Sequence, residues 1–225
     1  MKQQLILDFR SRNDKTFSNY VTGDNAALIE QLNTPEHNPF LFVSGAPSTG
    51  KTHLLCAACA TTKHAALIPL EAKHISIEVL DGLDSLSLIC LDNIHLIAGN
   101  AVWEEAVFHL YNRIKDAHQR LILSSRLPIP ELSFQLQDLN SRVSSSLSYH
   151  ILPLSDGNKV LALQQHARIH GIDLSTACSQ YLVNHFTRDM ASLLHLLNEL
   201  DTASLSAKRK LTIPFIRAFT GRAQT

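Results

Sequence analysis

Short apolar runs alternate with helical patterns over the first two thirds of the chain. Runs typical of buried strands are at residues 40–43, 65–70, 86–92 and 121–125, with a shorter one at 149–152. Apolar residues at helical spacing predict helices over 26–32, 53–60, 103–117 and 136–143, and a weakly amphipathic helix over 71–80. Because the run at 86–92 is almost uninterrupted, its strand should be buried on both faces. The pattern predicts an α/β fold with a parallel sheet.

After Pro153 the strand patterns end and only helical ones continue. Ser155 is a typical N-cap for a helix that ends before Gly171. Helices are also predicted at about 175–186 and 188–206. Thr212 caps a last helix, with Pro214 near its first turn. We therefore predict three segments, namely an N-terminal peptide and linker over 1–15, an α/β domain over 16–153 and a small all-helical lid domain over 154–225.

A candidate phosphate-binding loop lies between the first predicted strand of the sheet and the helix that follows it. This stretch reads Gly-Ala-Pro-Ser-Thr-Gly-Lys-Thr, with the spacing of a phosphate-binding loop. Loop N–H groups and the helix N-terminus would surround phosphates with positive charge. Lys51 would reach the β- and γ-phosphates, and Thr52 would hold Mg²⁺. We predict that ADP or ATP binds to Gly45, Ala46, Pro47, Ser48, Thr49, Gly50, Lys51, Thr52 and His53.

Asp92 supplies the second half of this site. It ends the apolar run over 86–92, and the carboxyl ends of parallel strands meet at one edge of a sheet. A carboxylate there would stand beside the loop and hold Mg²⁺ as a Walker B acid. The strand over 121–125 ends in two hydroxyls, Ser124 and Ser125, where a γ-phosphate would be sensed.

Composition narrows the class of protein. The chain has 20 basic and 20 acidic side chains, so it lacks the basic footprint of a protein that mainly grips duplex DNA. Cys56 and Cys59 form a single CxxC inside a predicted helix, which indicates core residues rather than a zinc site. His166 and His170 lie four residues apart without the other features of a metal motif. With no signal peptide and no apolar run of membrane length, we expect a cytoplasmic protein.

Several segments resemble known families. Residues 16–23, Thr-Phe-Ser-Asn-Tyr-Val-Thr-Gly, resemble the opening of the AAA+ module in the bacterial replication initiator DnaA. Segments 91–94, 103–104, 110–113 and 210–215 look more specifically like the Hda family, short DnaA homologues that promote inactivation of the ATP-bound initiator. The resemblance runs from Gln4 to about Arg217 and implies a AAA+ P-loop domain followed by a helical lid.

The resemblance also implies partners. In the Hda family an N-terminal glutamine-leucine peptide binds the sliding clamp, the β subunit of DNA polymerase III. Residues 4–9 fit this peptide, with Gln4 hydrogen-bonding in a small pocket and Leu5, Leu7 and Phe9 filling an apolar one. An edge strand is the alternative interpretation of so short an apolar segment.

Four further residues match positions of the family. Tyr20 and Val21 match the segment that flanks the nucleotide base. Arg142 matches the arginine finger, which would act across a subunit interface on ATP bound to DnaA. Arg188 matches the sensor-2 arginine of the lid, which would touch the bound phosphates in cis. We also expect the protein to form a homo-oligomer and to make a weak contact with DNA. We expect it to be associated with the bacterial replisome and nucleoid.

Departures from the family pattern shape the expected function. Asn93 stands where many AAA+ ATPases carry a second acid, so we expect weak intrinsic hydrolysis and a diphosphate-bound working form. Arg126 stands where the initiator has an acidic residue, which leaves the role of that strand end open. The chain ends after the lid without a helix-turn-helix domain, which argues against an initiator. An autonomous ATPase such as a DnaC-type helicase loader is the alternative, and a P-loop kinase of small molecules is a third class.

Overall fold

The structure is a computed structural model that describes residues 15–34, 39–71, 75–186 and 189–222. The chain divides into two compact units, residues 1–153 and 154–225. Several predicted site residues lie outside the described residues, namely Gln4, Leu5, Leu7 and Phe9 of the N-terminal peptide and Arg188 of the lid.

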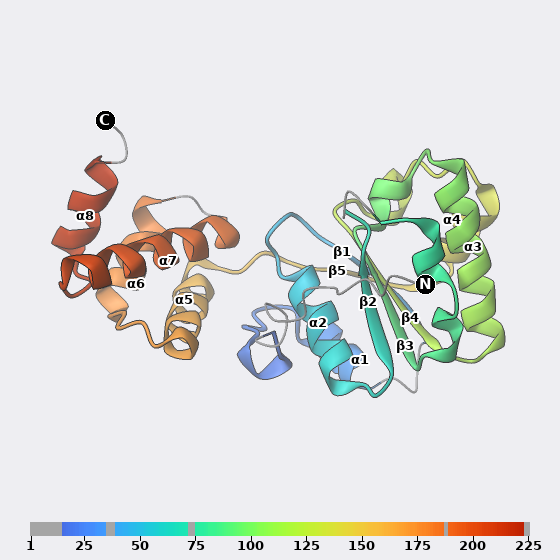
Figure 1. Cartoon of the computed structure of the whole chain (residues 1–225), viewed down its shortest axis with the longest axis horizontal. Coiled ribbons are helices and arrows are strands. Elements are labelled where there is room, and N and C mark those ends of the chain that lie inside the picture. The colour runs from blue at the N-terminus through green and yellow to red at the C-terminus, as the bar shows by residue number, and fades with distance from the viewer. Residues whose placement is uncertain (1–14, 35–38, 72–74, 187–188, 223–225) are drawn as a thin grey trace, which may run out of the picture. The chain divides into compact units, whose positions relative to one another are not determined.

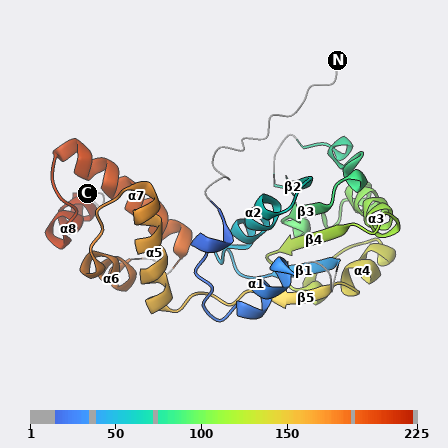
Figure 2. The same ribbon diagram turned by 90° about the horizontal axis from the view of Figure 1, so that it is seen from below.

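A five-stranded parallel sheet forms the centre of the first unit (Figure 1). Its strands are β1 (Phe40–Ser44), β2 (Ala65–Pro69), β3 (Leu88–Asp92), β4 (Arg120–Ser125) and β5 (Leu147–His150). They lie in the order β2-β3-β4-β1-β5, which Figure 2 shows along the sheet. Because every pair is parallel, all strands end at one edge, here called the carboxyl edge, and begin at the other, the amino edge. The predicted parallel α/β fold is confirmed.

Helices cover both faces of this sheet (Figure 1). Helices α1 (Ala26–Asn33) and α2 (Lys51–Thr61) pack on one face, and α3 (Ala101–Asp116) and α4 (Gln137–Ser144) on the other. Neighbouring strand residues face opposite helix layers, so Phe42 packs toward α3 while Leu41 and Val43 pack toward α2. Burial on both faces explains why the strand sequences are nearly uninterrupted apolar runs.

The segment after β2 differs from the prediction. A helix was predicted over 71–80, but in the described part of this segment Glu71 lies in a turn and only Ile77–Leu80 forms a helical turn, of the 3-10 type. Alternating β-branched residues at 75, 77 and 79 disfavour an α-helix. Arg113 of α3 also fixes the segment, because its guanidinium donates to the Leu80 carbonyl at 3.0 Å and to Asp84 at 3.1 Å.

Buried polar side chains fasten the helices to the loops around the sheet. Glu104 of α3 is fully buried, and its two carboxylate oxygens accept hydrogen bonds from the N–H groups of Gly99 and Leu136, each at 2.7 Å. Arg120 opens β4 and donates to the carbonyls of Gln31 and Leu32 at 2.8 and 3.1 Å. These carbonyls end α1 and have no partner within their helix, so Arg120 satisfies them.

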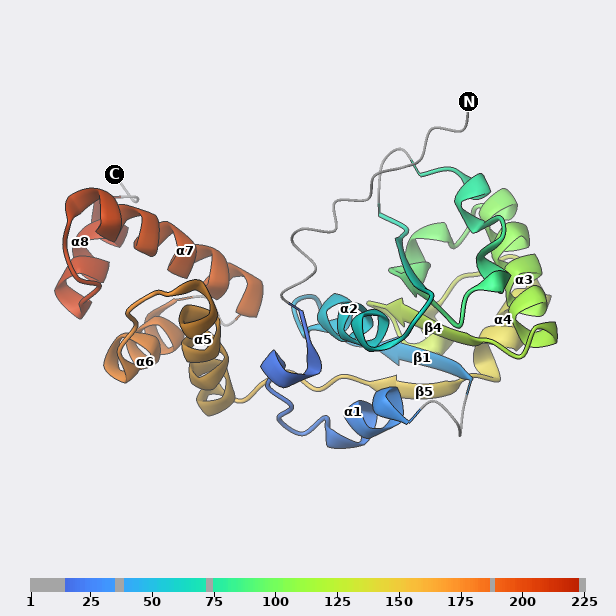
Figure 3. The same ribbon diagram turned by 60° about the horizontal axis from the view of Figure 1, so that its bottom comes forward.

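The second unit consists of helices α5 (Asp156–His170), α6 (Thr176–His185), α7 (Met190–Ala207) and α8 (Ile213–Arg222), shown in Figure 3. Ser155 caps α5 by accepting from the Asn158 N–H, and Gly171 ends it with a φ of 71°, as predicted. Leucines of α5, α6 and α7 form its core. Along the described ranges, every helix is too short or too polar to cross a membrane.

Both cysteines of the CxxC pack in the core between α2 and the sheet, as the sequence indicates. Cys56 is buried, and Cys59 is half-buried with its sulfur 3.6 Å from that of Cys90. None of the four cysteines, all of which lie in the described ranges, forms a disulfide bond. Cys56, Cys59 and Cys90 contribute to the packing between α2 and the sheet, and Cys178 belongs to the core of the second unit.

Candidate functional site

The phosphate-binding loop leaves β1 at the carboxyl edge and runs into the start of α2. A side chain would be strained at one glycine of the motif and crowded at the other. Gly50 has a φ of 94°, and a Cβ there would lie 2.6 Å from Cε2 of Tyr20. A Cβ on Gly45 would lie 3.0 Å from Oγ1 of Thr49. In the part of the chain that the structure describes, the N–H groups of Gly50, Lys51 and Thr52 have no acceptor, so they remain available to a phosphate.

Lys51 lies at the start of α2 with 6% of its surface exposed. Its Nζ donates to the Gly45 and Ala46 carbonyls at 2.6 and 2.8 Å. Burial lowers the pKa of Lys51, Asp92 raises it and Arg126 lowers it further. The ammonium group is therefore held against the loop, with two neighbouring charges of opposite sign acting on it.

Asp92 ends β3 beside the loop and is 1% exposed. One of its oxygens accepts from the Thr52 hydroxyl at 2.6 Å, and the other accepts from the Ser124 hydroxyl of β4. A hydroxyl and a carboxylate placed together suit Mg²⁺, which usually takes few protein ligands and keeps phosphate oxygens and water for the rest. Among the described residues, no three His, Cys, Asp or Glu side chains form a metal-binding group. The donor set thus fits a nucleotide-bound Mg²⁺.

Asn93 follows Asp92 with a φ of 64°, a left-handed conformation that asparagine tolerates better than most residues. Its N–H donates to the Ser124 hydroxyl at 3.0 Å, and its side-chain amide donates to Glu71 at 3.2 Å. The Asn93 side chain therefore faces the end of β2. The contact with Glu71 was not foreseen, since it depends on β2 and β3 being neighbours in the sheet.

Tyr20, half-buried, packs against the loop from the N-terminal side. Its hydroxyl donates to the Thr49 carbonyl at 3.2 Å, and its ring contacts His53 edge-on at 5.3 Å between centroids. Burial raises the pKa of Tyr20 to about 12, which keeps the hydroxyl protonated as a donor. Burial also lowers the pKa of His53, whose Nε2 lies 2.9 Å from the Thr16 carbonyl. The structure thus brings Tyr20 beside the loop. Val21 is the next residue and is half-buried, and the contact of both residues with a base stays a prediction.

His95 is a site residue that sequence reasoning missed. It lies three positions after Asp92, and its Nδ1 accepts from the Arg126 N–H at 3.3 Å. Burial lowers the pKa of His95, and the positive charges of Arg126 and Lys51 lower it further. No motif marks this histidine, because its place in the site depends on β3 and β4 lying side by side.

Arg142 is not brought to this site. It lies in the last turn of α4, and β5 begins at Leu147, which pairs with Leu41 near the start of β1. Arg142 therefore lies toward the amino edge, whereas the loop lies at the carboxyl edge. The two edges are about 15 Å apart, which is the length of a five-residue strand such as β1. Its guanidinium forms no hydrogen bond or ion pair with any residue that the structure describes.

Comparison with known proteins gives one family match and several structural likenesses. Residues 156–219 match the family described as "Hda, lid domain". The chain is similar to domain III of the Thermotoga maritima replication initiation protein DnaA, with a TM-score of 0.80 and 17% identity over 91% of this chain and 95% of that one. AMPPCP-bound DnaA from Aquifex aeolicus gives a TM-score of 0.66 and 20% identity over 82% of this chain and 65% of that one.

A motor protein shares the architecture as well. The RuvB Holliday junction branch migration motor of Thermotoga maritima gives a TM-score of 0.63 and 14% identity over 85% of this chain and 64% of that one. At these identities the structural likenesses establish the fold. They confirm the predicted α/β domain followed by a helical lid.

Proposed function

We propose that this Hda-like, DnaA-homologous AAA+ protein is a nucleotide-binding regulator of chromosome replication initiation. It would bind the DNA polymerase sliding clamp and promote hydrolysis of the ATP held by DnaA, which prevents re-initiation. One observation carries the proposal. Arg142 is free of partners among the described residues and lies at the edge of the sheet away from the chain's own phosphate-binding loop.

The nucleotide serves as a structural ligand in this proposal. Lys51 would bind the phosphates of ADP or ATP, while Thr52 and Asp92 would hold Mg²⁺. An amide cannot accept a proton as a carboxylate base does, so Asn93 leaves the site poor at hydrolysis. Bound nucleotide would then set the orientation of the α/β domain and the lid, with Arg188 of the lid touching the phosphates.

Catalysis would take place on the partner's nucleotide. An arginine finger places a planar, fixed positive charge where the γ-phosphate develops negative charge during hydrolysis. Arg142 suits this role because no carboxylate in the described ranges neutralises it. A second copy of this chain could join the assembly by the same edge, and DNA beside the clamp could add a weak contact. We place the protein in the bacterial cytoplasm at the replisome.

Deletion of residues 1–9 tests the clamp contact. The deletion should lower retention on immobilised clamp at least about tenfold, because Gln4, Leu5, Leu7 and Phe9 would supply the anchoring side chains. ADP affinity should be unchanged. The matched control is deletion of residues 1–3, which shortens the chain but keeps the peptide. Equal retention by both deletions would refute the tether.

An autonomous ATPase, such as a helicase loader, is the second candidate function. The complete loop and the Glu71 carboxylate beside Asn93 favour it. Under the leading proposal the purified chain alone should turn over ATP on the order of once per thousand seconds or more slowly. Phosphate release by the chain without partners measures this. Several turnovers per second would favour the autonomous enzyme instead.

A further inference from the structure

Two thiol groups meet between α2 and β3. Cys59 lies in the last turn of α2 and Cys90 in the middle of β3, and their sulfur atoms are 3.6 Å apart. In the sheet, Cys90 pairs with Leu67 of β2 on one side and with Ile122 of β4 on the other. The fold thus brings together two cysteines that are 31 positions apart in the sequence. Neither thiol has a role in the proposed function.

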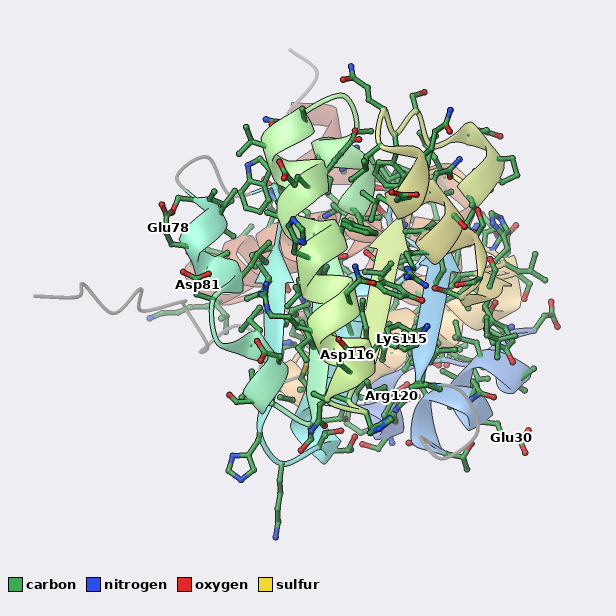
Figure 4. The ribbon with its side chains drawn as sticks, turned by 90° about the vertical axis from the view of Figure 1, so that its right-hand side faces the viewer. Glu30, Glu78, Asp81, Lys115, Asp116 and Arg120 are labelled. Carbon is green, nitrogen blue, oxygen red and sulfur yellow. The ribbon has the colours of Figure 1, made fainter. Side chains whose placement is uncertain are left out.

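The two cysteines differ in their access to solvent. Cys90 is fully buried, whereas Cys59 is half-buried and is followed by the exposed residues 60–61. Arg120, which Figure 4 labels at the start of β4, pairs with Leu88, so Cys90 lies two residues inside the sheet from the amino edge. A small oxidant in solution would therefore react with Cys59 first. Cys90 would then act as the resolving thiol.

The geometry favours a bond between these two sulfurs over the other pairing in this region. A disulfide bond is about 2.05 Å long, so the sulfurs of Cys59 and Cys90 must approach by about 1.5 Å. Cys56, the other cysteine of the CxxC, lies three positions before Cys59 in the same helix. Cβ atoms at this helical spacing are about 5–6 Å apart, beyond the roughly 3.5–4.5 Å that a disulfide spans.

We propose that Cys59 and Cys90 form an oxidation site, at which a hydroperoxide converts the two thiols into a disulfide that links α2 to β3 and weakens nucleotide binding. The effect on nucleotide rests on the proposed nucleotide site, whereas the oxidation site itself does not.

The reaction takes place in two balanced steps. The Cys59 sulfur attacks one oxygen of hydrogen peroxide, the O–O bond breaks and water leaves, so Cys59 becomes a sulfenic acid. The Cys90 sulfur then attacks the Cys59 sulfur, the S–O bond breaks as the S–S bond forms, and the hydroxyl leaves with the Cys90 proton as a second water. The two sulfurs together give two electrons to the peroxide oxygens. A dithiol reverses the reaction by thiol–disulfide exchange.

The disulfide would join the two elements that hold the proposed Mg²⁺ ligands. Thr52 lies at the start of α2, Asp92 lies two residues after Cys90, and the Thr52 hydroxyl donates to Asp92 at 2.6 Å. Because α2 and β3 pack in a dense core, drawing the sulfurs together displaces one element against the other. Mg²⁺ requires near-ideal octahedral geometry, so this displacement should lower the affinity for a Mg²⁺-bound nucleotide.

Oxidation of the whole chain with hydrogen peroxide tests the site. Peptide mass spectrometry should find a Cys59–Cys90 disulfide that dithiothreitol removes. Cys59→Ala and Cys90→Ala should each abolish it. Cys56→Ala is the matched control, because it removes a buried thiol from the same helix and should leave the disulfide in place. Thermal unfolding under reducing conditions checks that each variant keeps the fold.

Calorimetry with Mg-ADP tests the effect on the nucleotide site. The oxidised parent chain should bind Mg-ADP about tenfold more weakly than the reduced parent, and dithiothreitol should restore the affinity. Peroxide-treated Cys59→Ala should bind as tightly as the reduced parent. This variant separates the effect of the disulfide from that of oxidation elsewhere in the chain.

The remaining outcomes each decide a different question. Absence of a Cys59–Cys90 disulfide, or a Cys56–Cys59 disulfide in its place, would overturn the oxidation site. A Cys59–Cys90 disulfide that leaves the Mg-ADP affinity unchanged would overturn the effect on nucleotide binding. If the reduced chain does not bind Mg-ADP, the proposed nucleotide function fails, while mass spectrometry still decides whether the oxidation site exists.

Discussion

Arg142→Ala is expected to lower the stimulation of DnaA-bound ATP hydrolysis on the order of a thousandfold, the lower range for loss of an arginine finger. The reason is geometric and electrostatic. Arg142 is at the end of α4 toward the amino edge, and no carboxylate among the described residues competes for its guanidinium. The measurement is phosphate release from ATP bound in advance to DnaA, with the clamp loaded on DNA.

Two variants separate a finger from a structural arginine. Arg142→Lys keeps the charge but not the planar fork, so most of the loss should remain. Arg168→Ala removes an exposed arginine from the last turn of α5 and should leave stimulation unchanged. Clamp retention and nucleotide affinity should be equal in all three variants. If Arg142→Ala stimulates hydrolysis as well as the parent, the finger assignment is wrong.

The positions of Arg142 and the phosphate-binding loop constrain how this chain meets a relative. The loop lies at the carboxyl edge and Arg142 toward the amino edge. A contact that brings Arg142 to another molecule's nucleotide must therefore join unlike edges, and such a heterologous interface has no two-fold symmetry. The same contact leaves this chain's own nucleotide facing away from that partner. The structural role proposed for the nucleotide agrees with this separation.

The sheet could be predicted from the sequence because its strands are marked locally. Burial on both faces leaves few polar residues in β3, and the loop between β1 and α2 has a fixed spacing. The conformation of residues 75–80 was not predicted, since Arg113 and the apolar surface of α3 help to determine it together with the local β-branched residues. Tertiary contacts of that kind override local helical periodicity.

A sequence motif and the topology of a parallel sheet were enough to predict part of the candidate site. Asp92 follows from the rule that parallel strands end at one edge, and the Thr52 hydroxyl indeed lies 2.6 Å from its carboxylate. His95 and the Asn93–Glu71 contact required the strand order and the side-chain directions. Both contacts join residues that the sequence separates by more than twenty positions. Contacts between residues so far apart in the sequence cannot be predicted from local sequence patterns.

Lys51→Ala is expected to weaken ADP and AMPPCP about a hundredfold each, or about 2.7 kcal/mol, the loss of one charge-assisted interaction at a buried position. The Lys51 ammonium is held against the Gly45 and Ala46 carbonyls, so it is already placed for a phosphate. Calorimetry measures the affinities. Lys63→Ala, beyond the other end of α2, removes an exposed lysine as the control.

The Lys51→Ala variant also tests whether bound nucleotide determines the orientation of the arginine finger, Arg142. If bound nucleotide orients the α/β domain and the lid, Lys51→Ala should stimulate hydrolysis of DnaA-bound ATP less than the parent chain does. The loss should be seen at nucleotide concentrations that saturate the parent but not the variant. Binding to the clamp through residues 1–9 should be unchanged. Raising the nucleotide concentration about a hundredfold should restore stimulation, because the weakened site fills again by mass action. Full stimulation by Lys51→Ala without bound nucleotide would show that the nucleotide has no such role, and Arg142 would then act from a fixed position.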